Sequence, residues 1–308
     1  MKHLTLPLML LVCVGIPACN DNDCITCPVC PGDSCAATHQ LTITHDGLQR
    51  EYILYVPASY TGDEPVPLLL NFHALGSNAQ QQMAFGDFRP IADREGFLVA
   101  HPQGTQSESE PPLNFWNVST EGVDDVGFTA AIIDSIAADY SVDRKRVYAA
   151  GMSNGGTFSH HLAGLLSDEV AAIASVSGTM TPPMVVASNP VHPTPVMHIH
   201  GTEDPLVPYD GRPPFLPVAT QLEYWFEYNN CDPTPITTQL PDIYPDNGIT
   251  VEHIVHEDGD NGVNVEHLKI IGGTHAWPRM VGEVGSDVDA SEEIWQFLSR
   301  YNIDGVLG

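Results

Sequence analysis

The chain has 308 residues, 43% of them hydrophobic, and 11 Lys and Arg stand against 39 Asp and Glu, for a net charge of −28. A surface this acidic repels phosphate backbones and anionic lipid headgroups, which excludes a nucleic-acid partner and general membrane binding. It also disfavours strongly anionic substrates. The length and the hydrophobic content fit one large globular domain.

The first residues predict export. A short basic start (M-K-H) precedes an apolar run at residues 4–16 that is too short to span a membrane stably. The run ends at Ala18-Cys19, which resembles the processing site of a bacterial lipoprotein. We therefore expect residues 1–18 to be a signal peptide and Cys19 to be lipidated, with ordinary signal cleavage as the alternative. The protein would be secreted, or lipid-anchored at the cell surface or in the periplasm.

Residues 19–38 are expected to form a cysteine-rich tether with little to bury. The four cysteines with C-x2-C-x2-C-x4-C spacing are Cys24, Cys27, Cys30 and Cys35. The spacing is similar to that of an iron–sulfur or zinc site, whereas disulfides are the usual state of such cysteines in an exported chain. Both alternatives stay open. Residues 39–308 would then be the catalytic domain, in which Cys231 has no obvious partner.

The globular part begins with a predicted β-hairpin at residues 39–60, with Asp46-Gly47 in its turn. Continuous apolar runs, typical of strands buried on both faces of a parallel sheet, then alternate with amphipathic stretches. The predicted strands are residues 67–72, 97–101, 146–150, 171–176, 195–200 and 265–271, and the predicted helices are residues 80–96, 126–140, 157–166, 219–228 and 291–301. This alternation predicts an α/β fold with a mostly parallel central sheet and helices on both faces. The Pro-rich stretches 181–195 and 211–217 are predicted to be loops.

Residues 151–156 read G-M-S-N-G-G between a predicted strand and a predicted helix. Small residues two positions before and after Ser153 permit a strained strand-to-helix turn, the nucleophile elbow, which lifts the serine Oγ above the sheet. The N-terminus of the following helix stabilises negative charge at that place. The pattern predicts that Ser153 is the nucleophile of a hydrolase with the α/β-hydrolase fold.

A serine nucleophile needs a base, and the base needs an acid that orients it. In this fold the three follow in the order serine, acid, histidine, each just after a strand. Asp204 follows the predicted strand 195–200 and is the favoured acid, with Glu203 as the alternative because a shift of one residue changes which side chain points inward. His275 follows the predicted strand 265–271 and is the expected base.

The oxyanion hole needs two backbone N–H groups. One is expected from Asn154, the residue after the nucleophile, and the other from Leu75 or, alternatively, Ala74 in the loop after the third strand. Trp116 and Trp277 could line an apolar acyl pocket or could equally cover the core. We expect no metal and no cofactor.

Other polar residues are expected to be structural. His73 precedes the nucleophile in the chain and is expected to hold the oxyanion loop. His198 and His200 alternate along a buried strand, so we expect them to form hydrogen bonds at the edge of the sheet. Asp124 and Asp125 stand at the start of a predicted helix, where they can cap it.

Five ordered motifs together resemble the polyhydroxybutyrate depolymerase/feruloyl esterase group of α/β-hydrolases. They are F-H-A-L-G at residues 72–76, D-D-V-G-F at 124–128, G-M-S-N-G-G at 151–156, H-G-x-x-D-x-x-V-P at 200–208 and G-x-H-x-W-P at 273–278. The resemblance implies an exported serine esterase acting on a small-molecule or polymer ester, with Ser153, Asp204 and His275 as its triad. Two positions depart from the family pattern: Ala74 replaces a usual glycine, and Cys231 lacks the disulfide partner that the family often has.

We therefore expect a serine carboxylic-ester hydrolase that works through an acyl-enzyme, either feruloyl esterase-like or polyhydroxybutyrate depolymerase-like. A peptidase or a lactone hydrolase stays open, because a fold does not fix a substrate. A surface binding module without activity is the third alternative. Against it, all three triad residues are present in the required order.

Overall fold

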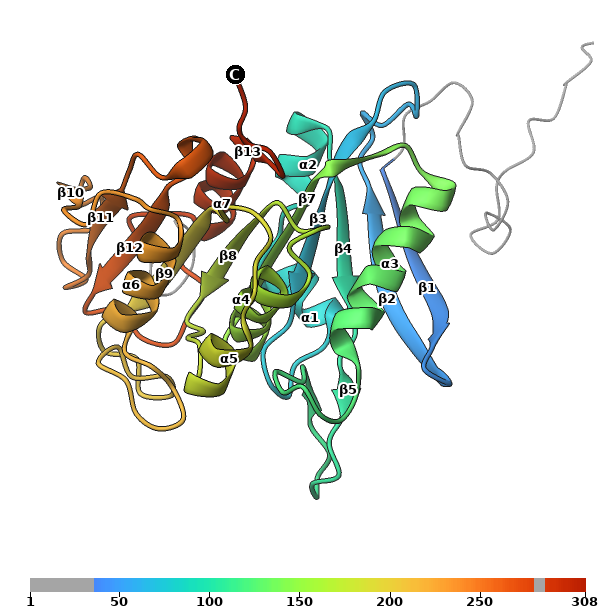
Figure 1. The fold of residues 1–308 in the computed structure, drawn as a ribbon, viewed down its shortest axis with the longest axis horizontal. Coiled ribbons are helices and arrows are strands. Elements are labelled where there is room, and N and C mark those ends of the chain that lie inside the picture. The colour runs from blue at the N-terminus through green and yellow to red at the C-terminus, as the bar shows by residue number, and fades with distance from the viewer. Residues whose placement is uncertain (1–35, 280–285) are drawn as a thin grey trace, which may run out of the picture.

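The computed structural model describes residues 36–279 and 286–308, and a ten-stranded sheet runs through the middle of this part of the chain (Figure 1). In their order across the sheet, the strands are β1 (Ala37–His45), β2 (Leu48–Val56), β4 (Leu98–Pro102), β3 (Val66–Phe72), β7 (Val142–Met152), β8 (Ala172–Val176), β9 (Val196–Gly201), β12 (Val265–Ile271), β11 (Thr250–His256) and β10 (Ile236–Gln239). The strands from β4 to β12 are mutually parallel, whereas those at both edges pair antiparallel. The predicted mostly parallel sheet and its N-terminal hairpin are confirmed.

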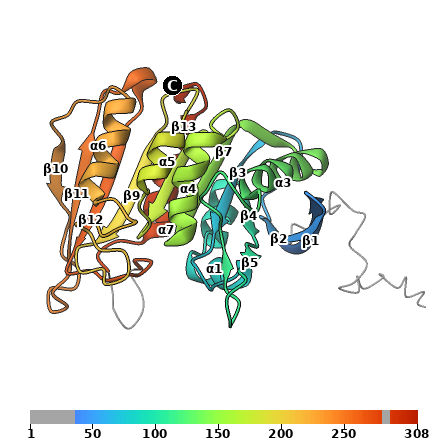
Figure 2. The ribbon, with the colours of Figure 1, turned by 60° about the horizontal axis from the view of Figure 1, so that its bottom comes forward.

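Helices cover both faces of this sheet. One face carries α3 (Asp125–Asp139), α4 (Asn154–Leu165), α5 (Pro182–Ala187) and α6 (Val218–Tyr228), which lie side by side in Figure 2. The other carries α1 (Ala79–Phe85), α2 (Arg89–Glu95) and α7 (Ala290–Leu298). Alternate residues of one strand therefore enter different cores: Leu68 and Leu70 pack towards α3 and α4, and Leu69 packs towards α2. Burial on both faces explains the continuous apolar runs.

Short elements complete the described part of the chain. They are β5 (Thr105–Gln106) with β6 (Asn114–Phe115), a 3-10 turn at Asp260–Gly262, and β13 (Tyr301–Asn302) with β14 (Gly305–Val306). The start of α3 is capped as expected, because the side chain of Asp124 accepts a hydrogen bond from the Gly127 N–H.

The single helix predicted at residues 80–96 is wrong, because the structure has two helices there. α1 ends at Phe85 with Gly86 as its C-cap, and α2 begins at Arg89, which Pro90 follows directly. A continuous helix would bring the ring of Pro90 against the carbonyl of residue 86, and Pro90 has no N–H to donate. The second helix ends at Gly96, which adopts the left-handed conformation with φ 75°.

Three elements lie where the sequence predicted none. The predicted loop at 181–195 contains α5, whose first residue is Pro182; proline is tolerated there because the first N–H of a helix has no acceptor. β11 and β10 extend the sheet beyond β12, so β9 is an interior strand. The expectation that His198 and His200 lie at the sheet edge is therefore wrong.

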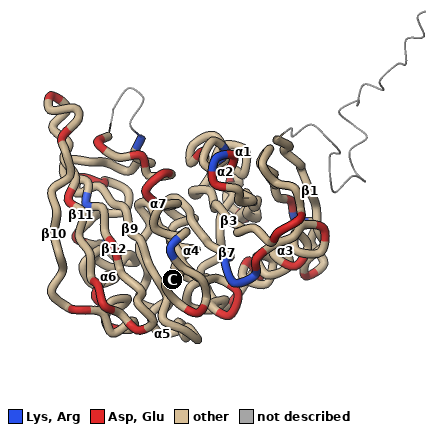
Figure 3. The backbone as a smooth tube through the Cα atoms, turned by 90° about the horizontal axis from the view of Figure 1, so that it is seen from above, with Lys and Arg blue, Asp and Glu red and all other residues tan. Residues whose placement is uncertain are grey.

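Acidic side chains are spread along most of the described chain and basic ones are few (Figure 3). None of the helices in residues 36–279 and 286–308 is both long and apolar enough to cross a bilayer. The expected signal peptide, Cys19 and the four tether cysteines lie outside the described residues. Cys231 is a free, buried cysteine.

Candidate active site

Ser153 occupies a strained turn between β7 and α4. Its φ of 56° and ψ of −118° lie outside the regions that a side chain favours, at a cost of about 1–3 kcal/mol. Its N–H donates to the carbonyl of Val176 at 2.7 Å, and its carbonyl accepts from the N–H of Thr157 at 2.8 Å, so the turn is held on both sides. A Cβ on Gly155 would overlap the carbonyl of Phe72, which explains the glycine two residues after the serine.

Asp204 follows β9 and is buried, whereas its neighbour Glu203 is exposed. Oδ1 of Asp204 accepts the N–H groups of Leu206 and Val207 at 2.8 and 2.9 Å. Oδ2 accepts from Nδ1 of His275 at 2.7 Å. This geometry favours Asp204 over Glu203 as the acid that orients the histidine.

Backbone contacts join the loop that carries Asp204 to the loop that carries His275. The N–H of Thr202 donates to the carbonyl of Ile270, and the N–H of Glu203 to that of Gly273, both at 2.9 Å. The N–H of Gly272 donates to Oγ1 of Thr202, also at 2.9 Å. The separation of acid and base is therefore fixed by hydrogen bonds between the carboxyl ends of two neighbouring strands, β9 and β12.

The charge of Asp204 is set by its partners. Burial alone would raise the pKa of this carboxyl, but hydrogen bonds from His200, His275 and the Val207 N–H outweigh burial and hold the pKa well below its ordinary value. Asp204 is therefore a carboxylate at neutral pH. As an acceptor it requires the proton of neutral His275 to be on Nδ1, which leaves Nε2 with a free lone pair.

His73 holds the loop after β3, which is the expected oxyanion loop, through hydrogen bonds. Its Nε2 accepts from the Gly104 N–H at 3.0 Å, so its proton is on Nδ1, 2.8 Å from the carbonyl of Ala74 that accepts it. Burial lowers the pKa of His73 to about 4, so the ring is neutral at pH 7. The indole N–H of Trp116 donates to the carbonyl of His73 at 3.0 Å. The loop shape is thus fixed from three sides.

Asn154 uses its side chain and its backbone differently. Its side-chain amide accepts from the N–H of Trp116 at 2.7 Å and donates to the carbonyl of Trp116 at 3.1 Å. Its own N–H is at the first position of α4, where no acceptor within the helix exists. Leu75, in the facing loop, has a side chain that is 56% exposed. Leu75 and Ala74 remain alternative donors of the second N–H.

Both candidate pocket tryptophans are buried. Trp116 is 1% exposed and stacks on Phe158, with ring centroids 5.2 Å apart. Trp277 is 4% exposed, and its N–H donates to Oγ of Ser291 at 3.1 Å. Burial therefore favours the core alternative for both.

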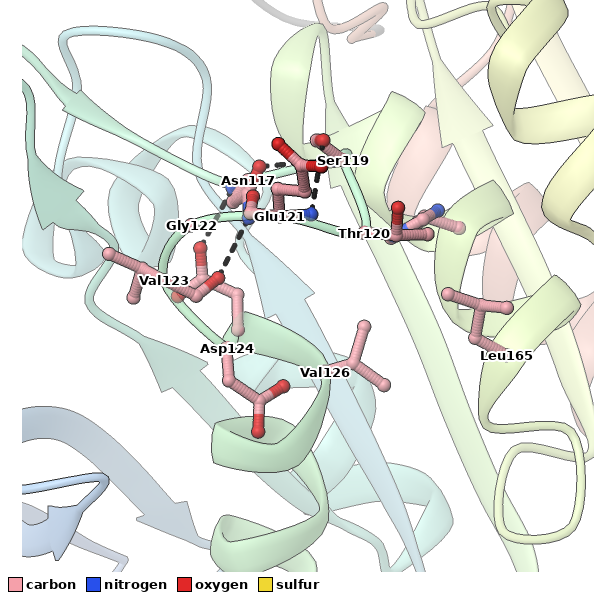
Figure 4. Close-up of a pocket in the computed structure, with 11 residues that line it drawn as sticks. Asn117, Ser119, Thr120, Glu121, Gly122, Val123, Asp124, Val126 and Leu165 are labelled. Carbon is pink, nitrogen blue, oxygen red and sulfur yellow. Dashed lines mark hydrogen bonds between the residues drawn. The ribbon is translucent and has the colours of Figure 1, made fainter.

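A cavity of about 330 Å³ lies between the start of α3 and the far half of α4 (Figure 4). Two hydrogen bonds from the Asn117 amide to the carbonyls of Glu121 and Val123 shape its rim. Ser153 and His275 are not among its lining residues, and neither is Asp204. This cavity is therefore separate from the site formed by the catalytic candidates.

One group of residues close to Asp204 was not predicted as part of the site. Nε2 of His200 lies 3.3 Å from Oδ2 of Asp204 and 2.8 Å from the carbonyl of Val207. The sequence did contain a signal for this group. His198 and His200 are two residues apart, which puts both rings on one face of β9, and Asp204 lies in the loop directly after that strand.

The proteins whose sequences are similar to this chain include named esterases. A bifunctional acetylxylan esterase/xylanase of Neocallimastix patriciarum is 30% identical over 266 residues, which are 84% of this chain and 34% of that protein. Feruloyl esterase B of Piromyces equi is 32% identical over 199 residues, 60% of this chain and 37% of that protein. The chain thus spans little more than a third of the length of either relative.

An acetyl xylan esterase from Aspergillus awamori has a similar structure, with a TM-score of 0.61 at 14% identity, covering 85% of this chain and 99% of that one. At this identity the likeness establishes the α/β-hydrolase fold. The sequence profile of the family described as esterase PHB depolymerase matches residues 50–210, more than half of the 308 residues. This chain therefore belongs to the polyhydroxybutyrate depolymerase/feruloyl esterase family.

Proposed function

We propose that this chain is a serine esterase in which Ser153 is the nucleophile, His275 the general base and Asp204 the acid. The observation that carries the proposal is the 2.7 Å contact between Nδ1 of His275 and Oδ2 of Asp204. The elbow with Ser153 ends β7, which is parallel to β9 and β12 in the same sheet, so all three groups emerge at one edge.

The proposed reaction has two halves. Nε2 of His275 takes the proton of Ser153 as Oγ attacks the ester carbonyl, and Asp204 stabilises the imidazolium. The N–H groups of Asn154 and of Leu75 or Ala74 hold the oxyanion. His275 then protonates the departing alcohol and deprotonates a water, which releases the acid from the acyl-enzyme and restores Ser153.

The substrate class follows from the family and the relatives. We propose that it is a carboxylic ester of the kind that feruloyl and acetylxylan esterases or polyhydroxybutyrate depolymerases cleave. The absence of a basic cluster in the sequence, with its net charge of −28, favours uncharged acyl groups. We further propose export by residues 1–18, with Cys19 lipidated and residues 19–38 serving as a tether.

The decisive variant is Ser153→Ala. Loss of the nucleophile should lower the turnover of a p-nitrophenyl short-chain ester by about three or more orders of magnitude. A fluorophosphonate probe should label the wild type on Ser153 and leave the variant unlabelled. Turnover near the wild-type rate in the variant would refute the assignment, and an unlabelled wild type would favour a binding module without activity.

Substrate choice needs a panel at equal enzyme concentration. Methyl ferulate, a soluble hydroxybutyrate oligomer and a butyrate ester separate the two family activities from general esterase activity. A peptide anilide and a lactone test the two other hydrolase classes. Cleavage of the anilide or the lactone with a kcat/KM above that of every ester would overturn the proposed reaction class.

A further inference from the structure

Four buried histidines lie beneath the loop of Asp204. They come from three elements, α4, β9 and β12, and each is at most 1% exposed: His160, His198, His200 and His267. Within the described residues, no group of His, Cys, Asp and Glu is arranged to hold a metal ion. Buried polar atoms generally have hydrogen-bond partners among protein groups, and most of these ring nitrogens do.

Hydrogen bonds order these rings in one direction. Oε1 of Gln221, on α6, accepts the N–H of Met180 at 2.7 Å, so its amide nitrogen faces Nδ1 of His198, 3.1 Å away, and donates to it. His198 then carries its proton on Nε2, which donates to Nδ1 of His200 at 3.0 Å. His200 in turn carries its proton on Nε2, which is directed at the carbonyl of Val207 and at Asp204.

The rings behind this row are neutral. Burial and the neighbouring histidines lower the pKa of His198 far below its ordinary value, and burial lowers the pKa of His160 and of His267 to about 3. His267 donates from Nδ1 to the carbonyl of His198 at 2.9 Å and accepts from the hydroxyl of Tyr209 at 2.8 Å. The direction of the row is therefore fixed at neutral pH.

We propose that His200 is a positioning residue of the catalytic triad. It is held by His198 and Gln221, and its Nε2–H donates to the carbonyl of Val207 at 2.8 Å. The same Nε2 lies 3.3 Å from Oδ2 of Asp204, the oxygen that accepts from His275. Together with the Leu206 and Val207 N–H groups on Oδ1, it fixes the rotation of the carboxylate, and it sets the basicity of Oδ2. The inference rests on the proposed function, since it concerns how the acid of that triad is held.

The effect on His275 has a defined sign. A donor on Oδ2 draws negative charge away from the contact with His275, so without it the carboxylate attracts the imidazolium more strongly. The acid limb of the profile of kcat/KM against pH, which reports protonation of the catalytic base, should then move to higher pH. A carboxylate free to rotate also positions the base less well, so the maximal rate falls.

Other titratable groups surround His200 and are unchanged in variants at position 200. His198, Asp204 and Tyr209, from its own strand and the loop that follows, contact its ring. Lys269 is its neighbour on β12, His160 and His267 lie against His198, and His275 contacts the same oxygen of Asp204. Lys269 is paired with Glu252 at 3.0 Å, so its charge is balanced on β11. His198 and Asp204 lie closest to the ring of His200, at 3.0 and 3.3 Å between the nearest polar atoms.

The test compares His200→Gln with His200→Asn. A glutamine amide reaches about as far as Nε2 and can still donate to Asp204, whereas an asparagine amide reaches only as far as Nδ1. Expected for His200→Asn is an acid limb about 0.5–1 pH unit higher and a maximal kcat/KM about tenfold lower, from the loss of a hydrogen bond to a charged group. His200→Gln should keep the wild-type limb.

His160→Gln is the matched control. His160 is as deeply buried and accepts from the indole N–H of Trp225 at 3.1 Å, but it does not contact Asp204. It should lose thermal stability without any shift of the limb. Wild-type limbs in both His200 variants, or equal shifts in both, would overturn the positioning role. Fluorophosphonate labelling of Ser153 in each variant keeps this outcome separate from a failure of the proposed function, in which wild type itself would not be labelled.

Discussion

Beneath Ser153 and the oxyanion loop the sheet packs on aromatic rings, whereas beneath Asp204 the same face of the sheet packs on histidines. Phe72, Trp116 and Phe158 contact one another with centroid distances of 5.1–5.2 Å. His198 and His200 are 5.1 Å apart and are joined by a hydrogen bond. The two regions are equally buried. They differ in the interaction that holds them, which is packing of aromatic rings in the first and hydrogen bonding between imidazoles in the second.

The difference matches what each region has to hold. In the proposed mechanism the elbow and the loop after β3 offer backbone N–H groups. The direction of such groups follows from the path of the chain, and non-directional packing is enough to fix that path. A carboxylate can rotate about its last bond, so only directional hydrogen bonds fix it. A buried polar network is most stabilising when every polar atom in it has a hydrogen-bond partner. In the described structure Nε2 of His160 has no such partner, so the histidine region is not fully satisfied.

Asp204→Asn removes the carboxylate that the hydrogen bonds hold, and it should have the largest effect on kcat. The amide cannot stabilise the imidazolium, and its N–H group favours the wrong tautomer of His275, so kcat should fall by about 10⁴-fold. Esterase assays on the purified variant measure this. Glu203→Gln is the control, because Glu203 is exposed and its change should leave kcat within about twofold. The reverse result would make Glu203 the acid.

Phe158→Ala removes a ring from the aromatic packing beneath Ser153 and should lower the stability of the fold. Phe158 is fully buried between Phe72 and Trp116, so its truncation should lower the free energy of unfolding by about 3–5 kcal/mol. Urea unfolding measures the change, and the remaining folded enzyme should keep the acid limb of the wild type. Phe85→Ala, at a 52% exposed site, should cost less than about 0.5 kcal/mol. A displaced acid limb in Phe158→Ala would mean that packing also sets the base.

His160→Gln sharpens the comparison through pH. Burial lowers the pKa of His160 to about 3 in the folded state, against about 6.5 unfolded. Between these values only the unfolded chain binds the proton, so stability falls as pH falls, by about 1.4 kcal/mol per pH unit for this group. The variant should lack that contribution between pH 6 and pH 4 in urea titrations. Trp225→Phe keeps the imidazole and removes its donor, so it should keep the slope; an equal slope in His160→Gln and wild type would contradict the folded pKa.

The sequence predicted the parts of this fold whose signal is local. Continuous apolar runs predicted β3, β4, β7, β8, β9 and β12, and the strand-end order predicted which aspartate meets which histidine. β11 was missed because its sequence, T-V-E-H-I-V-H, mixes polar and apolar residues on a half-buried strand. Without β11 and β10, β9 looked closer to an edge than it is, and for that reason the network through His200 was not foreseen.

The direction of individual side chains was the other feature that the sequence could not predict. Whether Asp204 or Glu203 points inward depends on the backbone of a loop pinned to Gly273 and Ile270, residues about seventy positions away. Whether Trp116 and Trp277 face substrate or core depends on Phe158, Ser291 and the chain around them. No periodicity in the sequence encodes such contacts, since they arise only when separate strands come together.

Leu75→Ala should have the smallest effect, because a backbone N–H survives the loss of a side chain. Leu75 is 56% exposed, so neither packing nor the oxyanion contact should change, and kcat/KM for a short-chain ester should stay within about threefold of wild type. A larger loss would mean that the side chain contacts the acyl group. Proline at position 75 or 74 removes one N–H at a time, and the variant whose kcat falls by about a hundredfold identifies the second oxyanion donor. If kcat falls in neither proline variant, the loop after β3 does not supply an oxyanion donor. The Asn154 N–H would then be the one remaining donor of the two proposed, and packing of that loop would have no part in holding the oxyanion.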